Sequence, residues 1–253
     1  NTNKAIILQH GTRGGDSKVT QSGNNNEANL DQTDDGSGGV GQVNASTITQ
    51  SGGSNKATVV QKTTTLALHS DSTVTQSGSS NQANVTQFDD DQKSTVSQTS
   101  DSNIAVVLQG QDPNTDNSWD NDSSVTQGGT GLHYANVLQT GLHNDSIVTQ
   151  TGSDNDAYVT QSGSTNGSTV DQSGSTDRAD VTQSGNNNTS GVTQIAATNR
   201  AIVLQSGNNN SSTLTQKKDL NAANVLQSGS GNSSTVSQDV ASGGIGYLNT
   251  ELD

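Results

Sequence analysis

The sequence predicts an all-β chain that folds as a β-solenoid of about ten two-strand coils, with amyloid-like cross-β stacking. Gln recurs along almost the whole chain, at spacings that are mostly 11 or 12 residues. Within each unit Asn, a small residue, an aliphatic residue and Gln follow one another at every second position. The small residue alternates between Ala and Ser without exception, so the full period is 22 residues, or two units.

Each unit is expected to be one strand followed by one turn. Residues at every second position share one face of an extended strand. Gly stands two residues after the marker Gln in 12 of the 20 units, and the Ser and Asn around it favour turns. Period-two patterning with β-branched residues contradicts a helix. Two units then close one coil, and successive coils stack at about 4.8 Å.

The composition excludes several classes of protein. Hydrophobic residues make up 25% and aromatic residues 2% of the chain, too little for a conventional apolar core. Cys is absent, which rules out disulfides, thiolate zinc sites and thiol catalysis. No apolar run reaches the roughly 18 residues of a membrane span, so we expect no membrane insertion. The net charge of −14 argues against nucleic acid as a partner.

We expect one solenoid domain over residues 1–238, with insertions near 33–43, 62–71 and 110–122. Each insertion follows an Ala-type unit and precedes a Ser-type unit, so all three should project from the same edge. The third insertion carries several acidic residues, the single Pro and the single Trp: Asp112, Pro113, Asp116, Trp119, Asp120 and Asp122. A calcium or partner site is one interpretation of this loop, and a solvated surface loop is the favoured one.

The aliphatic residue two positions before each Gln is Val, Ile or Leu in all 20 units. We expect these side chains to form a thin inward apolar core between the two sheets. They are Ile7, Val19, Leu30, Ile48, Val59, Val74, Val85, Val96, Val107, Val125, Val137, Val148, Val159, Val170, Val181, Val192, Val203, Leu214, Val225 and Val236.

Asn and Gln are expected to face inward near the corners of each coil, where buried amides need hydrogen-bond partners. Identical amides stacked coil over coil can form ladders, in which each side chain bonds the copies above and below. The residue six positions before Gln is Asn in 15 of the 20 units, and His133 and Asp177 are among the substitutes. The expected ladder residues are Asn3, Gln9, Gln21, Asn26, Gln32, Asn55, Gln61, Gln76, Asn81, Gln87, Gln98, Gln109, Gln127, Gln139, Asn144, Gln150, Asn155, Gln161, Asn166, Gln172, Gln183, Asn188, Gln194, Asn199, Gln205, Asn210, Gln216, Asn221, Gln227, Asn232 and Gln238.

Residues 239–253 are expected to form a degenerate C-terminal half-coil or tail. Gly243, Ile245, Tyr247 and Asn249 fall at the Asn, small, aliphatic and Gln positions of the repeat. This segment either caps the stack or docks on the next subunit.

The first unit already has the standard pattern, so we expect an uncovered strand edge at the front of the stack. The first and last coils are then templates for each other, and a contact of this kind continues into a filament. The residues expected at the subunit–subunit ends are Asn3, Ala5, Ile7, Gln9, Ser234, Val236, Gln238, Ile245 and Tyr247.

Residues 146–161 read Ser-x-Val-x-Gln-x-Gly-x-x-Asn-x-Ala-x-Val-x-Gln. This pattern resembles the curlin repeat of curli amyloid fibre subunits, and the resemblance covers about residues 3 to 238. The chain is similar to a major subunit with an expanded number of repeats. The Gly that precedes Asn in the family is usually replaced here, as at Asp154, Thr176 and Thr198.

The resemblance implies a structural subunit of an extracellular, self-assembling fibre on the cell surface, with roles in biofilm matrix and cell adhesion. It implies that the chain is secreted and that its signal peptide has been removed. The implied partners are further copies of the chain in a head-to-tail homopolymer, a minor nucleator subunit and an outer-membrane secretion pore.

No catalytic, cofactor or metal site is expected, and the chain is predicted not to be an enzyme. The four His residues are scattered, and His133 is interpreted as an amide substitute at a corner. The acidic runs at 34–35 and 89–91 fit neither an EF-hand loop nor a Gly-Gly-x-Gly-x-Asp calcium repeat.

A monomeric ice-binding solenoid is the alternative function. Thr flanks the inward aliphatic residue on both sides at residues 47–49, 73–75 and 213–215. Ranks of Thr-x-Thr on a flat solenoid face resemble the ice-binding surface of some antifreeze proteins. Strand propensity on a solvated face also explains the Thr content, and other residues interrupt the array: Lys18, Asp171 and Gly191.

Overall fold

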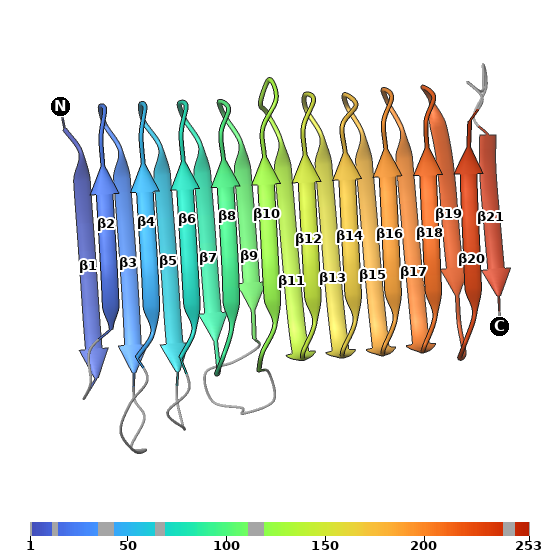
Figure 1. Ribbon diagram of the computed structural model, residues 1–253, viewed down its shortest axis with the longest axis horizontal. Coiled ribbons are helices and arrows are strands. Elements are labelled where there is room, and N and C mark those ends of the chain that lie inside the picture. Colours follow the sequence, from blue (N-terminus) through green and yellow to red (C-terminus); the bar gives the residue numbers. More distant parts are fainter. Residues whose placement is uncertain are drawn as a thin grey trace.

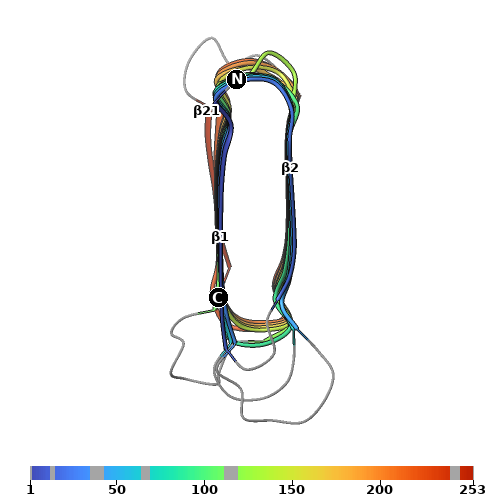
Figure 2. The same cartoon turned by 90° about the vertical axis from the view of Figure 1, so that its left-hand side faces the viewer.

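The computed structural model describes residues 2–11, 15–34, 43–63, 69–110, 119–239 and 246–252. It confirms the predicted fold class, because the strands form two parallel sheets wound into a β-solenoid. Figure 1 shows the strands side by side along the long axis, with the two termini at opposite ends. Viewed along that axis, the coils superpose on a flattened ring whose long sides are the two sheets (Figure 2).

One sheet contains the Ala-type strands and is called the Ala sheet. Its strands, in spatial order, are β1 (Lys4–Gly11), β3 (Glu27–Asp34), β5 (Lys56–Thr63), β7 (Gln82–Phe88), β9 (Ile104–Gln109), β11 (Tyr134–Leu142), β13 (Asp156–Ser164), β15 (Arg178–Asn186), β17 (Arg200–Asn208), β19 (Asn221–Gln227) and β21 (Gly246–Leu252).

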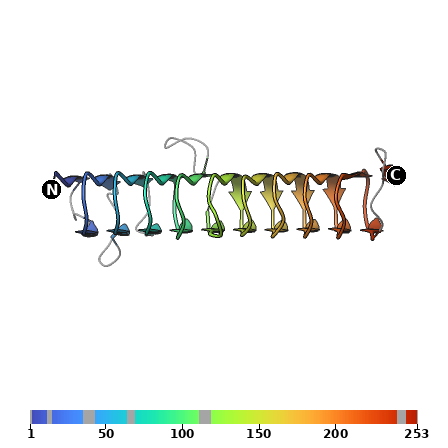
Figure 3. The ribbon, with the colours of Figure 1, turned by 90° about the horizontal axis from the view of Figure 1, so that it is seen from above.

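The other sheet contains the Ser-type strands and is called the Ser sheet. Its strands, in spatial order, are β2 (Asp16–Gln21), β4 (Ala45–Gln50), β6 (Asp71–Gln76), β8 (Lys93–Gln98), β10 (Asp122–Gln127), β12 (Asp145–Gln150), β14 (Gly167–Gln172), β16 (Thr189–Gln194), β18 (Ser211–Gln216) and β20 (Ser233–Gln238). From above, the two sheets run as two parallel rows along the molecule (Figure 3).

The strand register keeps each kind of residue in its own column. Val137, Val159 and Val181, for example, are successive Cα partners in the Ala sheet. The aliphatic residues from Leu30 to Val236 are at most 1% exposed, and the Ala column from Ala28 to Ala223 is 0% exposed. The apolar core is therefore a continuous strip along the axis rather than a globular centre.

The turns hold residues in the left-handed region of the backbone map. The residue just before the Asn position has φ of 55° at Asp154, 58° at Thr176 and 60° at Thr198. These are positions where the resembled family has Gly, which adopts positive φ without steric cost. Gly163, two residues after its Gln, has φ of +96°, and a Cβ there would overlap the carbonyl oxygen of Gly185 in the next coil.

A stretch of each insertion lies outside the described residues, namely 35–42, 64–68 and 111–118. Asp112, Pro113 and Asp116 fall in this group. Trp119 is described: it is bridged to Asp90 and Leu142 of neighbouring coils, and its ring centroid lies 6.0 Å from that of His143.

The expected register of the C-terminal segment is wrong. β21 pairs with β19, but Tyr247 is the Cα partner of Ala222 and Asn249 that of Asn224. Thr250 lies beside Val225, where Tyr247 had been expected, so the register differs by three residues. An odd shift exchanges the two faces of a strand, and this segment lacks the marker Gln that fixes register elsewhere. Gly243 and Ile245 lie outside the described residues.

Among the described residues, no helix has the length and apolar character that a membrane crossing requires.

Candidate functional site

The Gln side chains form two continuous hydrogen-bonded ladders along the molecule. In the Ala sheet each Nε2 donates to the Oε1 of the Gln in the next coil, from Gln9 to Gln227, at 2.7–3.0 Å. In the Ser sheet the same bonds run from Gln21 to Gln238 at 2.8–2.9 Å. Every marker Gln belongs to one of the two ladders.

The ladders also tie the two sheets together. The Nε2 of Gln161 in the Ala sheet donates to Gln183 and to the carbonyl oxygens of Asp145 and Asn166, the latter two at 2.9 and 3.0 Å. Asp145 begins a strand of the Ser sheet, so one amide joins the next coil and the opposite sheet. Gln161 is 0% exposed, and each hydrogen bond adds about 0.5–1.5 kcal/mol of net stability.

The Asn side chains differ from the expected amide-to-amide ladder. Asn166 Nδ2 donates to the carbonyl oxygens of Ser162, in its own turn, and Gly185, in the next coil, at 3.0 and 2.9 Å. Its Oδ1 accepts the backbone N–H of Asn188 at 3.0 Å. Amide-to-amide contacts accompany this arrangement from Asn166 to Asn144 and from Asn188 to Asn166, both at 3.1 Å. Asn therefore mainly stabilises the turns, because its Nδ2 donates hydrogen bonds to turn carbonyl oxygens.

His133 replaces Asn in this column and reproduces both of its roles. Its Nε2 lies 2.7 Å from the carbonyl oxygen of Gly128, and its Nδ1 lies 3.3 Å from the backbone N of Asn155. The neutral ring with the proton on Nε2 satisfies both contacts, since Nδ1 must accept. Burial lowers the pKa of His133 below its ordinary value, because burial disfavours the charged ring.

Asp177 replaces Asn two coils further along and reproduces only one of the two roles. Its Oδ1 accepts the backbone N–H of Asn199 at 2.8 Å. Its Oδ2 stands in the place of the donor Nδ2, and it is buried without a hydrogen-bond partner. Burial raises the pKa of Asp177 to about 6, and the nearby negative charge of Asp219 acts in the same direction.

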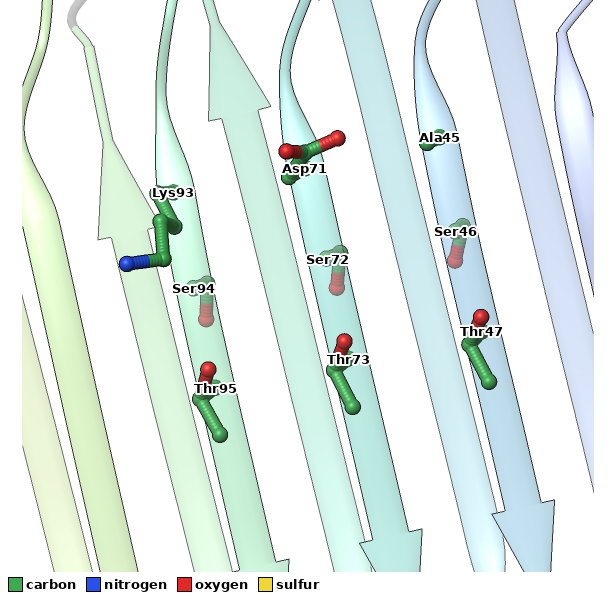
Figure 4. Close-up of a pocket in the computed structure, with 9 residues that line it drawn as sticks. All are labelled: Ala45, Ser46, Thr47, Asp71, Ser72, Thr73, Lys93, Ser94 and Thr95. Carbon is green, nitrogen blue, oxygen red and sulfur yellow. The ribbon is translucent and has the colours of Figure 1, made fainter.

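The outer face of the Ser sheet carries aligned hydroxyl groups. Thr47, Thr73 and Thr95 are successive Cα partners, and Thr49 is the partner of Thr75. Figure 4 shows the first three Thr side chains pointing to the same side of β4, β6 and β8. A shallow groove of about 160 Å³ lies beside them. Asp71 and Lys93, the first residues of β6 and β8, also line this groove.

The outer face of the Ala sheet carries a small aromatic and charged cluster. The rings of Tyr134 and Tyr158 lie 5.4 Å apart, and the Arg178 guanidinium lies 4.6 Å from the Tyr158 ring centroid. Arg178 Nε also lies 3.0 Å from a carboxylate oxygen of Asp180, and Arg200 lies 3.9 Å from the same oxygen. The period-two pattern predicts that these residues face outward but not that they contact one another.

The two ends of the stack differ in how far they are covered. At the N-terminal end, Ile7 of β1 is 44% exposed although it belongs to the core column, and Val19 of β2 is only partly buried. At the C-terminal end, Val225 of β19 and Val236 of β20 are each 1% exposed. The inward residues of β1, from Asn3 to Gln9, thus present an open ladder end.

The acidic residues near Trp119 each contact a separate basic side chain rather than one another. Asp120 lies 2.9 Å from His143 Nδ1, and Asp122 lies 3.0 Å from Lys93 Nζ. Over the described ranges, no group of three or more His, Asp or Glu residues is placed to hold a metal ion.

Comparison with known families gives a match over part of the chain. Four overlapping segments match the family model of the curlin associated repeat: residues 134–163, 152–185, 163–195 and 185–217. These segments contain β11 to β18, the part of the solenoid with the most regular 11-residue units. No curated protein matches the chain.

Proposed function

Residues 134–217 match the curlin associated repeat, and from this premise we propose that the chain is the structural subunit of an extracellular amyloid-type fibre. Copies add head to tail, and the first coil of one copy extends the sheets of another. The role is assembly rather than catalysis. Each added copy gains strand pairing, amide ladders and burial of the core strip.

The open ladder at β1 is the observation that carries this proposal. Ile7 is 44% exposed, whereas Leu30, the next residue of its column, is 1% exposed. Gln9 already donates to Gln32 at 3.0 Å, and its Oε1 can accept a further Gln from a preceding coil. An exposed strand edge with unpaired backbone groups is a template for another chain.

The finer biological setting rests on the family alone. We propose that the chain is secreted after removal of a signal peptide, and that its fibre lies on the cell surface. There it contributes to biofilm matrix and to adhesion. A minor nucleator subunit and an outer-membrane secretion pore are the proposed partners besides further copies.

Electron microscopy of the purified chain at neutral pH tests the central proposal. We expect unbranched fibres with a meridional reflection near 4.8 Å, the spacing of stacked strands. A chain that stays monomeric at high concentration over days contradicts it.

Two neighbouring substitutions test whether β1 is a joining surface. Ile7→Asp places a charge in the core column at the open end, and we expect it to abolish elongation, because a buried unpaired charge is costly. Leu8→Asp is the matched control: Leu8 is similarly exposed, at 47%, and alternates with Ile7 to the outer face. The control should elongate like the parent chain, and equal inhibition by both variants opposes the proposal.

A second candidate, ice binding, is favoured by the Thr rows on β4 and β6. Thr47 with Thr73 and Thr49 with Thr75 form a regular array of hydroxyl and methyl groups. Thermal hysteresis of the unassembled chain is the measurement. Thermal hysteresis that Thr73→Tyr abolishes supports ice binding. A chain without thermal hysteresis leaves fibre assembly as the proposed function.

A further inference from the structure

The two sheets of the solenoid contain different numbers of strands. Within the described residues, the Ala sheet has 11 strands and the Ser sheet has 10. The extra strand is β21, which pairs with β19 at the C-terminal end and adds half a coil. If β1 of a second copy paired with β21, a gap one strand wide would remain in the Ser sheet between β20 and β2 of that copy. Both sheets can continue across a joint only where β21 has left the edge of β19.

The register of β21 interrupts the columns that the other strands maintain. Leu252 is the Cα partner of Gln227, and Thr250 is the partner of Val225. The strand pair before it aligns Gln205 with Gln227, and their amides are hydrogen-bonded at 2.7 Å. The Ala-sheet ladder therefore ends at Gln227, since Leu has no amide to continue it.

β1 of a second copy matches the edge of β19 better than β21 does. Its Asn3, Ala5, Ile7 and Gln9 repeat the order of Asn221, Ala223, Val225 and Gln227. Pairing in that register continues the Gln ladder. It also continues the column in which the side chain at the Asn position accepts the backbone N–H of the next coil, as Asn199 Oδ1 does from Asn221. The open end of one copy thus fits the covered end of another once β21 is displaced.

We propose that β21 is a detachable cap, which covers the edge of β19 in the free chain and is displaced by β1 of a second copy during assembly. This inference rests on the proposed fibre function. The open end agrees with it, because Ile7 of β1 is 44% exposed and its core column lacks a neighbouring strand that the edge of β19 can supply. The cap delays addition at the C-terminal end and leaves the N-terminal end open.

A disulfide lock tests the cap in the full-length chain. Asn224 and Asn249 are Cα partners in β19 and β21, and the chain has no Cys of its own. Adjacent strands lie about 4.8 Å apart, within the Cα range of a disulfide. Asn224→Cys with Asn249→Cys, oxidised, should lower the elongation rate on preformed seeds at least ten-fold, and reduction should restore it.

The matched control places the same disulfide inside the stack. Thr58 and Asn84 are Cα partners in β5 and β7 and occupy the column of Asn224. Thr58→Cys with Asn84→Cys should elongate like the parent chain in both redox states. A 224–249 lock that elongates at the parent rate with its disulfide intact overturns the proposal.

Removal of the cap is the complementary experiment. A chain that ends at Asp239 should assemble with a shorter lag than the full chain at equal concentration. Equal lags contradict the cap but leave the fibre function standing. If neither the truncated chain nor the reduced lock forms fibres, the fibre function itself fails, and the cap fails with it.

Discussion

Asp177 and His133 are the residues whose ionisation bears most directly on the fold, because both replace Asn in one buried column. A protonated Asp177 carries a hydrogen that can be donated toward a turn carbonyl, as the Asn Nδ2 does, whereas the carboxylate cannot. A neutral His133 serves both contacts, whereas the imidazolium would set an N–H against the N–H of Asn155. The two substitutions therefore respond to pH in opposite directions.

The stability that Asp177 contributes should be present in acid and lost as pH rises. Its folded pKa of about 6 lies above the ordinary value of 3.8, so the contribution is full below about pH 4 and disappears through pH 6. Asp177→Asn should stabilise the chain at pH 7 by up to about 3 kcal/mol, since one pKa unit corresponds to about 1.4 kcal/mol. Urea unfolding of the unassembled chain between pH 4 and 8 measures this.

His133 supplies the control for that experiment. Its pKa is lowered, so its contribution is present above the ordinary value of 6.5 and is lost as pH falls. In the Asp177→Asn variant the free energy of unfolding should fall as pH is lowered, because His133 remains. In the His133→Asn variant it should fall as pH rises toward neutral, because Asp177 remains. The same pH profile in both variants contradicts the assignment.

The left-handed turn residues predict a second effect at this scale. Thr176 and Thr198 hold φ near 60°, which costs an L-residue roughly 1–2 kcal/mol. Thr176→Gly and Thr198→Gly should each stabilise the chain by about 0.5–1 kcal/mol, after the greater unfolded-state freedom of Gly is subtracted. Urea midpoints provide the measurement. Asn187→Gly, at an equivalent turn with φ of 56°, should gain less, because Asn tolerates this region.

At the scale of the element, a strand is held by what its inward face shares with the neighbouring coils. Gln161 in β13 makes hydrogen bonds to both neighbouring coils and to the opposite sheet, whereas Thr160 beside it faces outward. The inward residues therefore determine the register, and the outer residues are free to vary in chemistry.

Removal of one ladder amide should be far more harmful than loss of an outer side chain. Gln161→Leu leaves the Gln183 side-chain oxygen without its donor, and the carbonyl oxygens of Asp145 and Asn166 each lose one donor. A group left unsatisfied costs roughly 1–3 kcal/mol. We expect a loss of several kcal/mol in the free energy of unfolding, measured in urea. Thr160→Ala should change it by less than about 1 kcal/mol. Comparable losses in the two variants oppose a structural ladder.

The strands and their columns were predictable, because Gln, the aliphatic residue and the Ala or Ser recur at fixed spacing. The role of Asn was not predictable, because its partners are turn carbonyls such as that of Gly185. The positions of these carbonyls depend on how the turns of successive coils stack. The register of β21 also escaped prediction, because no Gln marks it and residues such as Leu248 and Leu252 suit either face. The left-handed φ at Thr176 could have been inferred from the Gly that the curlin repeat has there.

At the scale of the whole molecule, the charge of the chain opposes its assembly. The net charge is −14, so copies that approach one another repel. Salt shortens the range of this repulsion, from about 10 Å at 0.1 M to about 3 Å at 1 M.

Assembly should therefore accelerate as salt is added. We expect the lag before fibre formation to shorten between 0.05 and about 0.5 M NaCl, since hydrogen bonds and apolar burial are screened much less than repulsion between exposed charges. Light scattering against time, with sucrose solutions of matched viscosity as the control, provides the measurement. A lag that lengthens with salt would mean that attractive charge pairs dominate the joint.

The parallel pairing of every strand in both sheets gives any polymer of this chain a direction. All coils advance in the same sense from β1 to β20, so the two tips of a fibre are chemically distinct and no two-fold axis perpendicular to the fibre relates them. Growth at the two tips should proceed at unequal speeds, as in other polar filaments.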